Sequence, residues 1–591
     1  MDASSSPASP RRADPVLTEI VRNAVIAVTE EMKTNLMRTA YNIIIYEALD
    51  FTTGLFTAKG ETVSIGLGLP MFIRGMAETV KAKMKHYGVD AMKPGDIYVT
   101  NDAYTTGSHL NHVTLTMPIF HQGVLAGFAC CMAHWIDIGG ALRGHGTDIY
   151  AEGLQIPICK YQDQGTVNQD LLDIIKMNVR IPSRAMGDLR AQVAAVKTGE
   201  RRFTQLLDRY GRDLVIDAIA QVMDHSEAKA RARARSIPDG TYEAESYMDD
   251  DGVDLGKKVP IKVKVIVEGD TMTIDLSEVS NQVRGFYNSG QTTGIGCTQV
   301  AFKCVTSPTD YPVNDGSFRN LKSIVPAGKV ISAIRPAPMR KWMTYPMTVI
   351  DTVFKALEPA IPTRVIAGHH ADLLTPNQYG VNPKTKEFFI ASLGPLGGGW
   401  GAKHNEDGVS ATVCINDGDT HNSPIEQTEF KFPMVIESFS LIPDSGGAGK
   451  YRGGLGVERV LRNRANLVVN CQVDRMHCRP WGLQGGHEAT GNELAIRHGA
   501  KGEWQTNFNN AKFVFDLKDD GDAYRMRSGG GGGYGHPWER DIAAVLRDVK
   551  QGYVSVTAAE EIYGVVVDGE TGAVDERATE RKRNALEKAN R

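Results

Sequence analysis

Three glycine-rich stretches constrain the fold of this chain more than any other sequence feature. Their sequences are GPLGGGWGAKHNEDG (394–408), SGGAGKYRGGLG (445–456) and SGGGGGYG (528–535). None of them has the G-x-x-x-x-G-K-[ST] spacing of a phosphate-binding loop. Because glycine carries no Cβ atom, we interpret the three stretches as tight turns and as places where one backbone segment approaches another closely.

The hydrophobic pattern changes along the chain and predicts an α+β, multi-domain protein. The clearest element begins at Asp14-Pro15, a helix-start signal that is followed by apolar residues three or four apart as far as Leu36. The 591 residues divide into five expected regions. These are a disordered lead-in (1–14), an N-terminal mixed α/β region (15–167), a central helical region (168–236), a large glycine-rich and mostly β region (237–525), and a glycine-rich segment followed by two helices (526–591).

Composition and charge argue against several classes of protein. The net charge is −4 without a long basic run, so we expect no nucleic-acid partner and no binding to an anionic membrane. No stretch approaches the roughly 18 uninterrupted apolar residues of a membrane span. The eight cysteines form no C-x-x-C pair, which favours reduced thiols and a cytoplasmic location.

Of the four histidines between residues 101 and 140, His109, His112 and His134 could meet at one end of a hairpin formed by two strand-like runs. HVTLTMPIF and GVLAGFACCMAH are predicted to pair as antiparallel strands around Gln122, with His112 and His134 as diagonal neighbours. His109 lies three residues before His112. Three neutral imidazoles with one open coordination position are typical of a catalytic metal centre. The alternative is that these histidines are ordinary polar residues at strand ends.

A nearby carboxylate would complete such a metal site. Asp50, Asp102 and Asp137 are the candidates in the sequence, and each could bind the ion directly or orient a histidine. Asp102 and Asp137 are also candidates for the catalytic base.

Several stretches taken together resemble the hydantoinase B/oxoprolinase family, over residues 14 to 565. They are DPVLTEIVRNAVIAVTEEMKTNLMRTAY, GDIYVTNDAYTTGSHLNHVTL, AHWIDIGG, EGLQIPICK, GGGWGAKHNEDGVSA, NSPIEQTEF and SGGGGGYGHPWERD. The resemblance implies one subunit of a hetero-oligomeric, ATP-dependent enzyme. ATP would be bound by a hydantoinase A-type partner subunit and not by this chain. The implied activities are the opening of hydantoins, 5-oxoproline and other lactams, and the carboxylation of acetone or acetophenone.

The resemblance also implies a divalent metal, zinc or manganese, at Asp50, His109, His112 and His134. Two departures from the family pattern bear on the function, and a third is that YEALDF lacks the common arginine pair. His112 stands where an aspartate is usual, which removes one negative charge from the ligand set and alters the metal's properties. Trp135 stands where a second histidine is common, and it either lines a pocket for an aromatic substrate or packs in the core.

Three functions follow from these observations. The first is a carboxylase subunit that adds bicarbonate-derived carbon to an acetophenone-like ketone through phosphorylated intermediates. The second is a subunit of a hydantoinase, 5-oxoprolinase or lactam hydrolase that opens a cyclic amide. The third is a non-catalytic scaffold subunit. The two departures favour the first, and the majority activity of the family favours the second.

Overall fold

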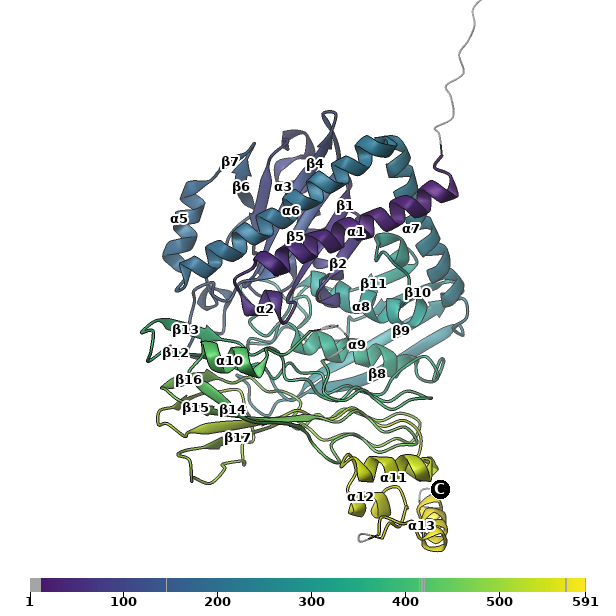
Figure 1. Ribbon diagram of the computed structural model, residues 1–591. Coiled ribbons are helices and arrows are strands. Elements are labelled where there is room, and N and C mark those ends of the chain that lie inside the picture. Colours follow the sequence, from purple (N-terminus) through teal and green to yellow (C-terminus); the bar gives the residue numbers. More distant parts are fainter. Residues whose placement is uncertain are drawn as a thin grey trace, which may run out of the picture.

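The computed structural model describes residues 12–144, 146–413, 415, 418, 420–568 and 571–589. Its mixture of helices and sheets has the α+β architecture that the sequence predicts. Helix α1 and the C-terminal helices lie at opposite ends of the molecule (Figure 1). The described part of the chain contains four sheets.

Helix α1 (Pro15–Thr39) begins where the sequence predicts. The side chain of Asp14 caps it by accepting a hydrogen bond from Leu17 N at 2.8 Å, and Pro15 occupies the first turn, where a missing N–H costs nothing. Apolar residues on one helical face are buried in the main hydrophobic core. They are Val21, Val25, Val28, Met32 and Leu36.

A seven-stranded antiparallel sheet forms the N-terminal region and carries the histidines. Its strand order is β2-β1-β5-β4-β3-β6-β7. The strands are β1 (Phe51–Thr57), β2 (Thr62–Leu67), β3 (Ile97–Thr100), β4 (His112–His121), β5 (Val124–His134), β6 (Cys159–Asp163) and β7 (Thr166–Val167). Three shorter helices lie between these segments: α2 (Ile43–Tyr46), α3 (Gly75–Tyr87) and α4 (Ala103–Thr106).

Three helices follow this sheet in the chain, within the region predicted to be helical. They are α5 (Gln169–Asn178), α6 (Pro182–Tyr210) and α7 (Arg212–Ala234). Helix α6 packs against strands β4 and β5 and against α1, so the two long helices lie across the same sheet (Figure 1). Helix α6 is therefore part of the layer that buries the sheet, while α5 and α7 pack against other helices.

A second sheet has the order β11-β10-β9-β8 and packs against two further helices. Its strands are β8 (Gly240–Met248), β9 (Val259–Glu268), β10 (Thr271–Asp275) and β11 (Leu321–Ile324). The helices, α8 (Gln291–Thr306) and α9 (Thr344–Leu357), lie within the region predicted to be mostly β. Nearly every residue of α9 is buried, Thr348, Asp351 and Thr352 included, so it has no exposed polar face of the kind that marks a surface helix in a sequence.

Two four-stranded sheets complete the second half of the chain, with orders β13-β12-β16-β18 and β14-β15-β19-β17. Their strands are β12 (Asn377–Val381), β13 (Phe388–Ala391), β14 (Met434–Leu441), β15 (Val457–Asn463), β16 (Leu467–Asn470), β17 (Glu493–Arg497), β18 (Val514–Leu517) and β19 (Ala523–Arg527). Helix α10 (Ile425–Lys431) precedes β14. Three helices end the chain where two were predicted: α11 (Ile542–Lys550), α12 (Val556–Glu561) and α13 (Glu576–Ala589). No helix in the described ranges has the length and apolar character needed to span a membrane.

The glycine-rich stretches pack backbone against backbone. Gly531 N donates to Gly454 O at 3.0 Å, and Gly454 N donates to Trp400 O at 2.9 Å. A Cβ atom added to Gly531 would lie only 1.9 Å from Trp400 O. The predicted close approaches are confirmed, whereas glycines with positive φ occur in these stretches only near their ends, at Gly394 and Gly535. The interior glycines therefore allow close contact between backbone segments and do not form turns.

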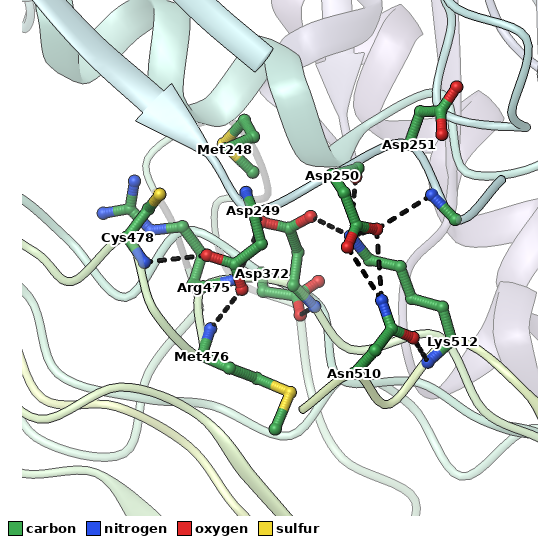
Figure 2. A network of polar contacts seen from close by, with 12 residues as sticks. Met248, Asp249, Asp250, Asp251, Asp372, Arg475, Met476, Cys478, Asn510 and Lys512 are labelled. Atoms are coloured by element: carbon green, nitrogen blue, oxygen red, sulfur yellow. Dashed lines mark hydrogen bonds and ion pairs between the residues drawn. The ribbon is translucent and has the colours of Figure 1, made fainter. Parts of the chain in front are cut away.

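A buried ionic network joins the segment that follows β8 to two distant loops (Figure 2). The ammonium of Lys512 donates to Asp474 Oδ2 at 2.5 Å and to Asp250 Oδ1 at 3.1 Å. Asp249 accepts hydrogen bonds from the backbone N–H groups of residues 476–478. Because these carboxylates are satisfied by the chain itself, we assign the network to structural support.

Candidate active site

One end of the seven-stranded sheet gathers the predicted site residues. Strands β1, β5 and β4 are neighbours, so Asp50 before β1, His134 at the end of β5 and His112 at the start of β4 lie in a row. His134 N donates to Asp50 O at 3.1 Å, which continues the pairing beyond β1. His109 lies in the turn before β4, where its carbonyl accepts a hydrogen bond from His112 N.

The register of the hairpin differs from the predicted one. His112 pairs directly with His134, not diagonally. Gln122 and Gly123 both have positive φ and form a two-residue turn of the kind that joins tight hairpins. A bulge at Ile119/Phe120 then shifts the pairing by one residue and brings the two histidines opposite each other.

The side chains of His109, His112 and His134, here called the histidine cluster, face one another. Their ring centroids lie 4.4 to 5.2 Å apart. His112 Nε2 is hydrogen-bonded to Asp50 Oδ1 at 2.9 Å, and His109 Nδ1 lies 3.1 Å from the carbonyl of Arg340. His109 Nε2 and the Nδ1 atoms of His112 and His134 are buried without a hydrogen-bond partner among the described residues.

Burial sets the protonation of this cluster. It lowers the pKa of His109 well below its usual value, and His112 and His134 lower it further. Burial also lowers the pKa of His134 to about 4. Burial would raise the pKa of Asp50, but the neighbouring His112 outweighs it, and the pKa is lowered. Near neutral pH, His109 and His134 are therefore neutral imidazoles and Asp50 is a carboxylate, which are the forms that bind metal ions.

The donors fit a divalent metal in kind but not in their present positions. In the described ranges, no three His, Cys, Asp or Glu side chains are arranged so that they could hold an ion. The unpartnered nitrogens of the histidine cluster are suitable ligands. Asp50 Oδ1 is bonded to His112 and orients that ring, which leaves Nδ1 of His112 as the ligand. The second oxygen of Asp50 takes no part in this bond and could bind the ion.

A cavity of about 150 Å³ opens beside the cluster. Asp50, His109 and His134 line it on the side of the sheet. Further residues of the first half, among them Asp137 and Glu152, also line it. Residues from the second half of the chain complete the lining, and they include Arg340, Lys341, Trp342, Leu373, Thr375, Ile390 and Pro395. The volume is below the roughly 300–1,000 Å³ of sites for drug-sized ligands, so it suits a small substrate and not a nucleotide.

Trp135 does not line the cavity. It is fully buried, is not among the residues that line the cavity, and its Nε1 donates to Gln192 Oε1 at 2.9 Å. Side chains alternate along an extended chain, so His134 and Ile136 reach the cavity while Trp135 points to the opposite face. The tryptophan of the cavity is Trp342, which no sequence pattern singled out. It stacks on Phe72 with centroids 5.6 Å apart.

The two proposed bases have different surroundings. Asp102 lines a separate surface hollow, where it accepts hydrogen bonds from Thr105 and from Arg335 at 2.6 and 2.9 Å. Asp137 does line the cavity, but its oxygens accept hydrogen bonds from Gly139 N and from the Arg180 and Ile181 backbone. Asp137 thus holds the chain leading into α6, and Asp102 lies outside the cavity.

Glu152 is a cavity carboxyl that sequence reasoning missed. Its Oε1 accepts hydrogen bonds from the backbone N–H groups of Met339 and Arg340, each at 2.7 Å. Its Oε2 is buried without a partner among the described residues. Burial raises the pKa of Glu152 to about 7, which suits proton transfer near neutral pH. The only signal in the sequence was its place in the motif EGLQIPICK.

Comparisons with known proteins identify the family and agree with the fold. The sequence profile of the hydantoinase B/oxoprolinase family matches residues 14–537. The chain is 33% identical to the beta subunit of the caprolactamase of Pseudomonas jessenii, over 97% of its own length and 99% of that protein. It is 29% identical to a protein of Pseudomonas sp. (strain NS671) provisionally named as the B component of a D-/L-hydantoinase, over 94% and 96% of the two chains.

Two solved structures share the whole architecture. The crystal structure of the ATP-dependent caprolactamase from P. jessenii superimposes with a TM-score of 0.90, covering 97% of this chain and all of that one at 29% identity. Acetone carboxylase in its nucleotide-free form superimposes with a TM-score of 0.89 at 21% identity, covering 98% of this chain and 83% of that one, which establishes a common fold. The profile and the full-length relatives lead to one conclusion: the chain belongs to the hydantoinase B/oxoprolinase family.

Proposed function

We propose that this chain is a subunit of an ATP-dependent enzyme that opens a small cyclic amide, such as a lactam, in the cavity beside the histidine cluster. The observation that carries the proposal is the set of unpartnered imidazole nitrogens next to a cavity of about 150 Å³. Full-length similarity to one chain of a caprolactamase supports a lactam as the substrate class.

Asp50, His109, His112 and His134 would hold a divalent metal, zinc or manganese. When bound there, such an ion polarises a carbonyl group and lowers the pKa of water. The protein's own contribution is to fix the ligands. Asp50 orients His112 at 2.9 Å, and the carbonyl of Arg340 accepts a hydrogen bond from His109 Nδ1–H. The lone pair of His109 is then on Nε2, the nitrogen without a partner.

The remaining cavity residues have roles that follow from their contacts. Opening a cyclic amide requires a proton on the departing nitrogen, and Glu152 is placed to supply it because Oε2 is free and the pKa is about 7. Trp342 and its stacking partner Phe72 shield the site from bulk water. Asp137 keeps the wall of the cavity attached to the start of α6.

ATP would be bound by a hydantoinase A-type partner subunit in a cytoplasmic hetero-oligomer. The names of the relatives support a partner, since the beta subunit of caprolactamase is by name one part of a larger enzyme. Phosphorylating an amide oxygen makes the carbonyl carbon easier to attack, which explains why a hydrolysis would consume ATP.

A second candidate is the carboxylation of a small ketone, with bicarbonate as co-substrate. His112 favours it, because this imidazole stands where the family resemblance implies an aspartate and so removes one negative charge from the ligand set. The aromatic pocket expected at Trp135 no longer supports an acetophenone-like substrate, since this side chain lies in the core.

The deciding experiment uses the chain co-expressed with its ATP-binding partner. The complex is incubated with ATP, carbon-13 bicarbonate and a panel of lactams, hydantoins and ketones, and product masses are measured. We expect a ring-opened product heavier by one water. A product that carries the labelled carbon would instead establish the carboxylase.

Matched variants test whether the histidine cluster is responsible. His109→Ala and His134→Ala should lose both bound metal and turnover, whereas His86→Ala, on the surface away from the cavity, should lose neither. If both cluster variants turn over fully and hold no stoichiometric metal, the histidine cluster is not catalytic. It would then have a scaffold role only.

A further inference from the structure

Arg340 and Lys341 are adjacent cations that line the same cavity as the histidine cluster. Arg340 Nη1 donates to the carbonyl of Ala141 at 2.7 Å, and Lys341 Nζ donates to the carbonyl of Thr375 at 2.9 Å. Neither forms an ion pair within 4.0 Å with any carboxylate of the described ranges. An ammonium has three donors and a guanidinium five, so both retain unused N–H groups.

The nearest carboxyl groups do not neutralise this pair. Glu152 acts electrostatically on Arg340 but uses Oε1 for backbone N–H groups. Asp372 acts on Lys341 but accepts from the backbone N–H groups of Leu373 and Asp474. Burial raises the pKa of each carboxyl to about 7, so neither is a full negative charge at neutral pH.

The buried lysines of the described chain are better satisfied than Lys341, which is half-buried. Lys512 contacts two aspartates, and Lys83 donates to Thr114 Oγ1 and O and to Thr116 Oγ1. Lys341 has one carbonyl. Removing charge from water without a partner is costly, and a cation left this way beside a cavity is suited to an anionic ligand.

We propose that the cavity contains an oxyanion subsite, in which Arg340 and Lys341 together bind the phosphate or carboxylate group of a ligand next to the histidine cluster. The planar fork of Arg340 matches two oxygens of either group, and Lys341 adds a point charge. This deepens the proposed function, on which it rests for the identity of the ligand: the species handled in the cavity would carry an anionic group, either a phosphoryl group received from ATP or the carboxylate of an opened product.

The test measures binding on the full-length chain alone, after metal has been removed and the chelator dialysed away. Isothermal titration with inorganic phosphate and with acetate gives the dissociation constants, and it requires neither ATP nor a partner. We expect saturable binding by the unmodified chain and at least tenfold weaker binding by Lys341→Met and Arg340→Gln. The control is Lys355→Met, because Lys355 also donates to a single carbonyl, at 3.0 Å, but lies outside the cavity.

Tighter binding of phosphate would assign the subsite to a phosphoryl group, and tighter binding of acetate to a carboxylate. Absence of binding by the unmodified chain, or equal loss in Lys355→Met, would overturn the proposal. If a cavity variant does not fold, the unmodified protein still provides a test. Burial lowers the pKa of Lys341 to about 8, so a bound anion should cause proton uptake near that pH, measured as a dependence of the binding heat on the buffer.

The two proposals fail separately. A chain that binds phosphate but opens no cyclic amide keeps the subsite and loses the proposed reaction. A chain that turns over lactams but binds neither anion keeps the reaction and loses the subsite.

Discussion

His112 and His134 face each other directly across strands β4 and β5, with ring centroids 5.2 Å apart. Directly opposed residues in an antiparallel pair have Cβ atoms about 4.5–5.5 Å apart, whereas diagonal neighbours are about 7–8 Å apart. The bulge at Ile119/Phe120 produces this direct pairing. A local irregularity of the backbone therefore determines whether these two rings can share a ligand.

Asp50→Asn should weaken zinc binding by about 10–100-fold, because a neutral amide is a poorer ligand and a poorer partner for His112 Nε2. Competition with a chromogenic chelator measures the affinity. Asp102→Asn is the matched control, since this aspartate pairs with Arg335 in a separate hollow. Equal weakening in both variants would mean that the effect is not local to the histidine cluster.

Glu152→Gln should change how stability depends on pH. The pKa of Glu152 is raised from 4.5 to about 7, so the folded chain binds this proton more tightly than the unfolded chain. The contribution of Glu152 to stability is therefore full below about pH 4.5 and falls as the pH rises to about 7, by at most about 1.4 kcal/mol per pH unit. The variant should gain in relative stability between pH 5 and 7, as measured by thermal unfolding.

Asp96→Asn is the control for this titration. The pKa of Asp96 is lowered because hydrogen bonds from Gln164 N, Lys93 N and Tyr98 outweigh its burial. The carboxylate of Asp96 stays ionised from pH 5 to 8. The difference in stability between Asp96→Asn and the unmodified chain should therefore be the same across this range. If the stability difference between Glu152→Gln and the unmodified chain is also independent of pH, Glu152 does not carry the proton assigned to it.

Lys512→Met should destabilise the fold by about 3–5 kcal/mol, because it leaves Asp250 and Asp474 buried without their cation. The urea midpoint provides the measurement. Lys403→Met removes an exposed pair with Glu406, for which about 0–1 kcal/mol is expected. If the two variants lose the same stability, the network in Figure 2 is not a support of the fold.

Gly531→Ala should cost at least about 3 kcal/mol or prevent folding, because the new Cβ atom would overlap the backbone carbonyl of Trp400. Gly187→Ala is the comparison. There the nearest atoms belong to the side chain of Tyr41, which is 58% exposed and free to swing aside, and alanine also favours the helix. Similar melting temperatures for both variants would refute the backbone-on-backbone account.

The sequence predicts those parts of this fold that local chemistry determines. The start of α1 follows from Asp14 and Pro15, and both strands of the histidine hairpin follow from their composition. The register did not follow, because no residue type identifies the bulge at Ile119/Phe120. Helix α9 was missed because nearly all of its residues are buried, polar ones included, so it has no solvent-exposed face.

The cavity could not be predicted from local sequence patterns, because its residues come from distant parts of the chain. The carbonyl of Arg340 contacts His109 across 231 positions of sequence, so no local pattern joins the cations to the histidines. Trp135 and Trp342 illustrate the difficulty. The first is next to a predicted ligand in sequence and lies in the core, while the second is remote in sequence and lines the cavity.

The residues that line the cavity are synthesised at different times, because they lie in both halves of the chain. A nascent chain that has emerged from the ribosome as far as the end of α7 already contains Asp50 and the histidine cluster, but not Arg340, Lys341 or Trp342. Because N-terminal segments fold first during synthesis, the histidine cluster is complete before the cavity walls that come from the second half of the chain. A metal bound at the proposed site would therefore load before the chain is finished, and a prematurely terminated product would carry the cluster without an enclosed cavity.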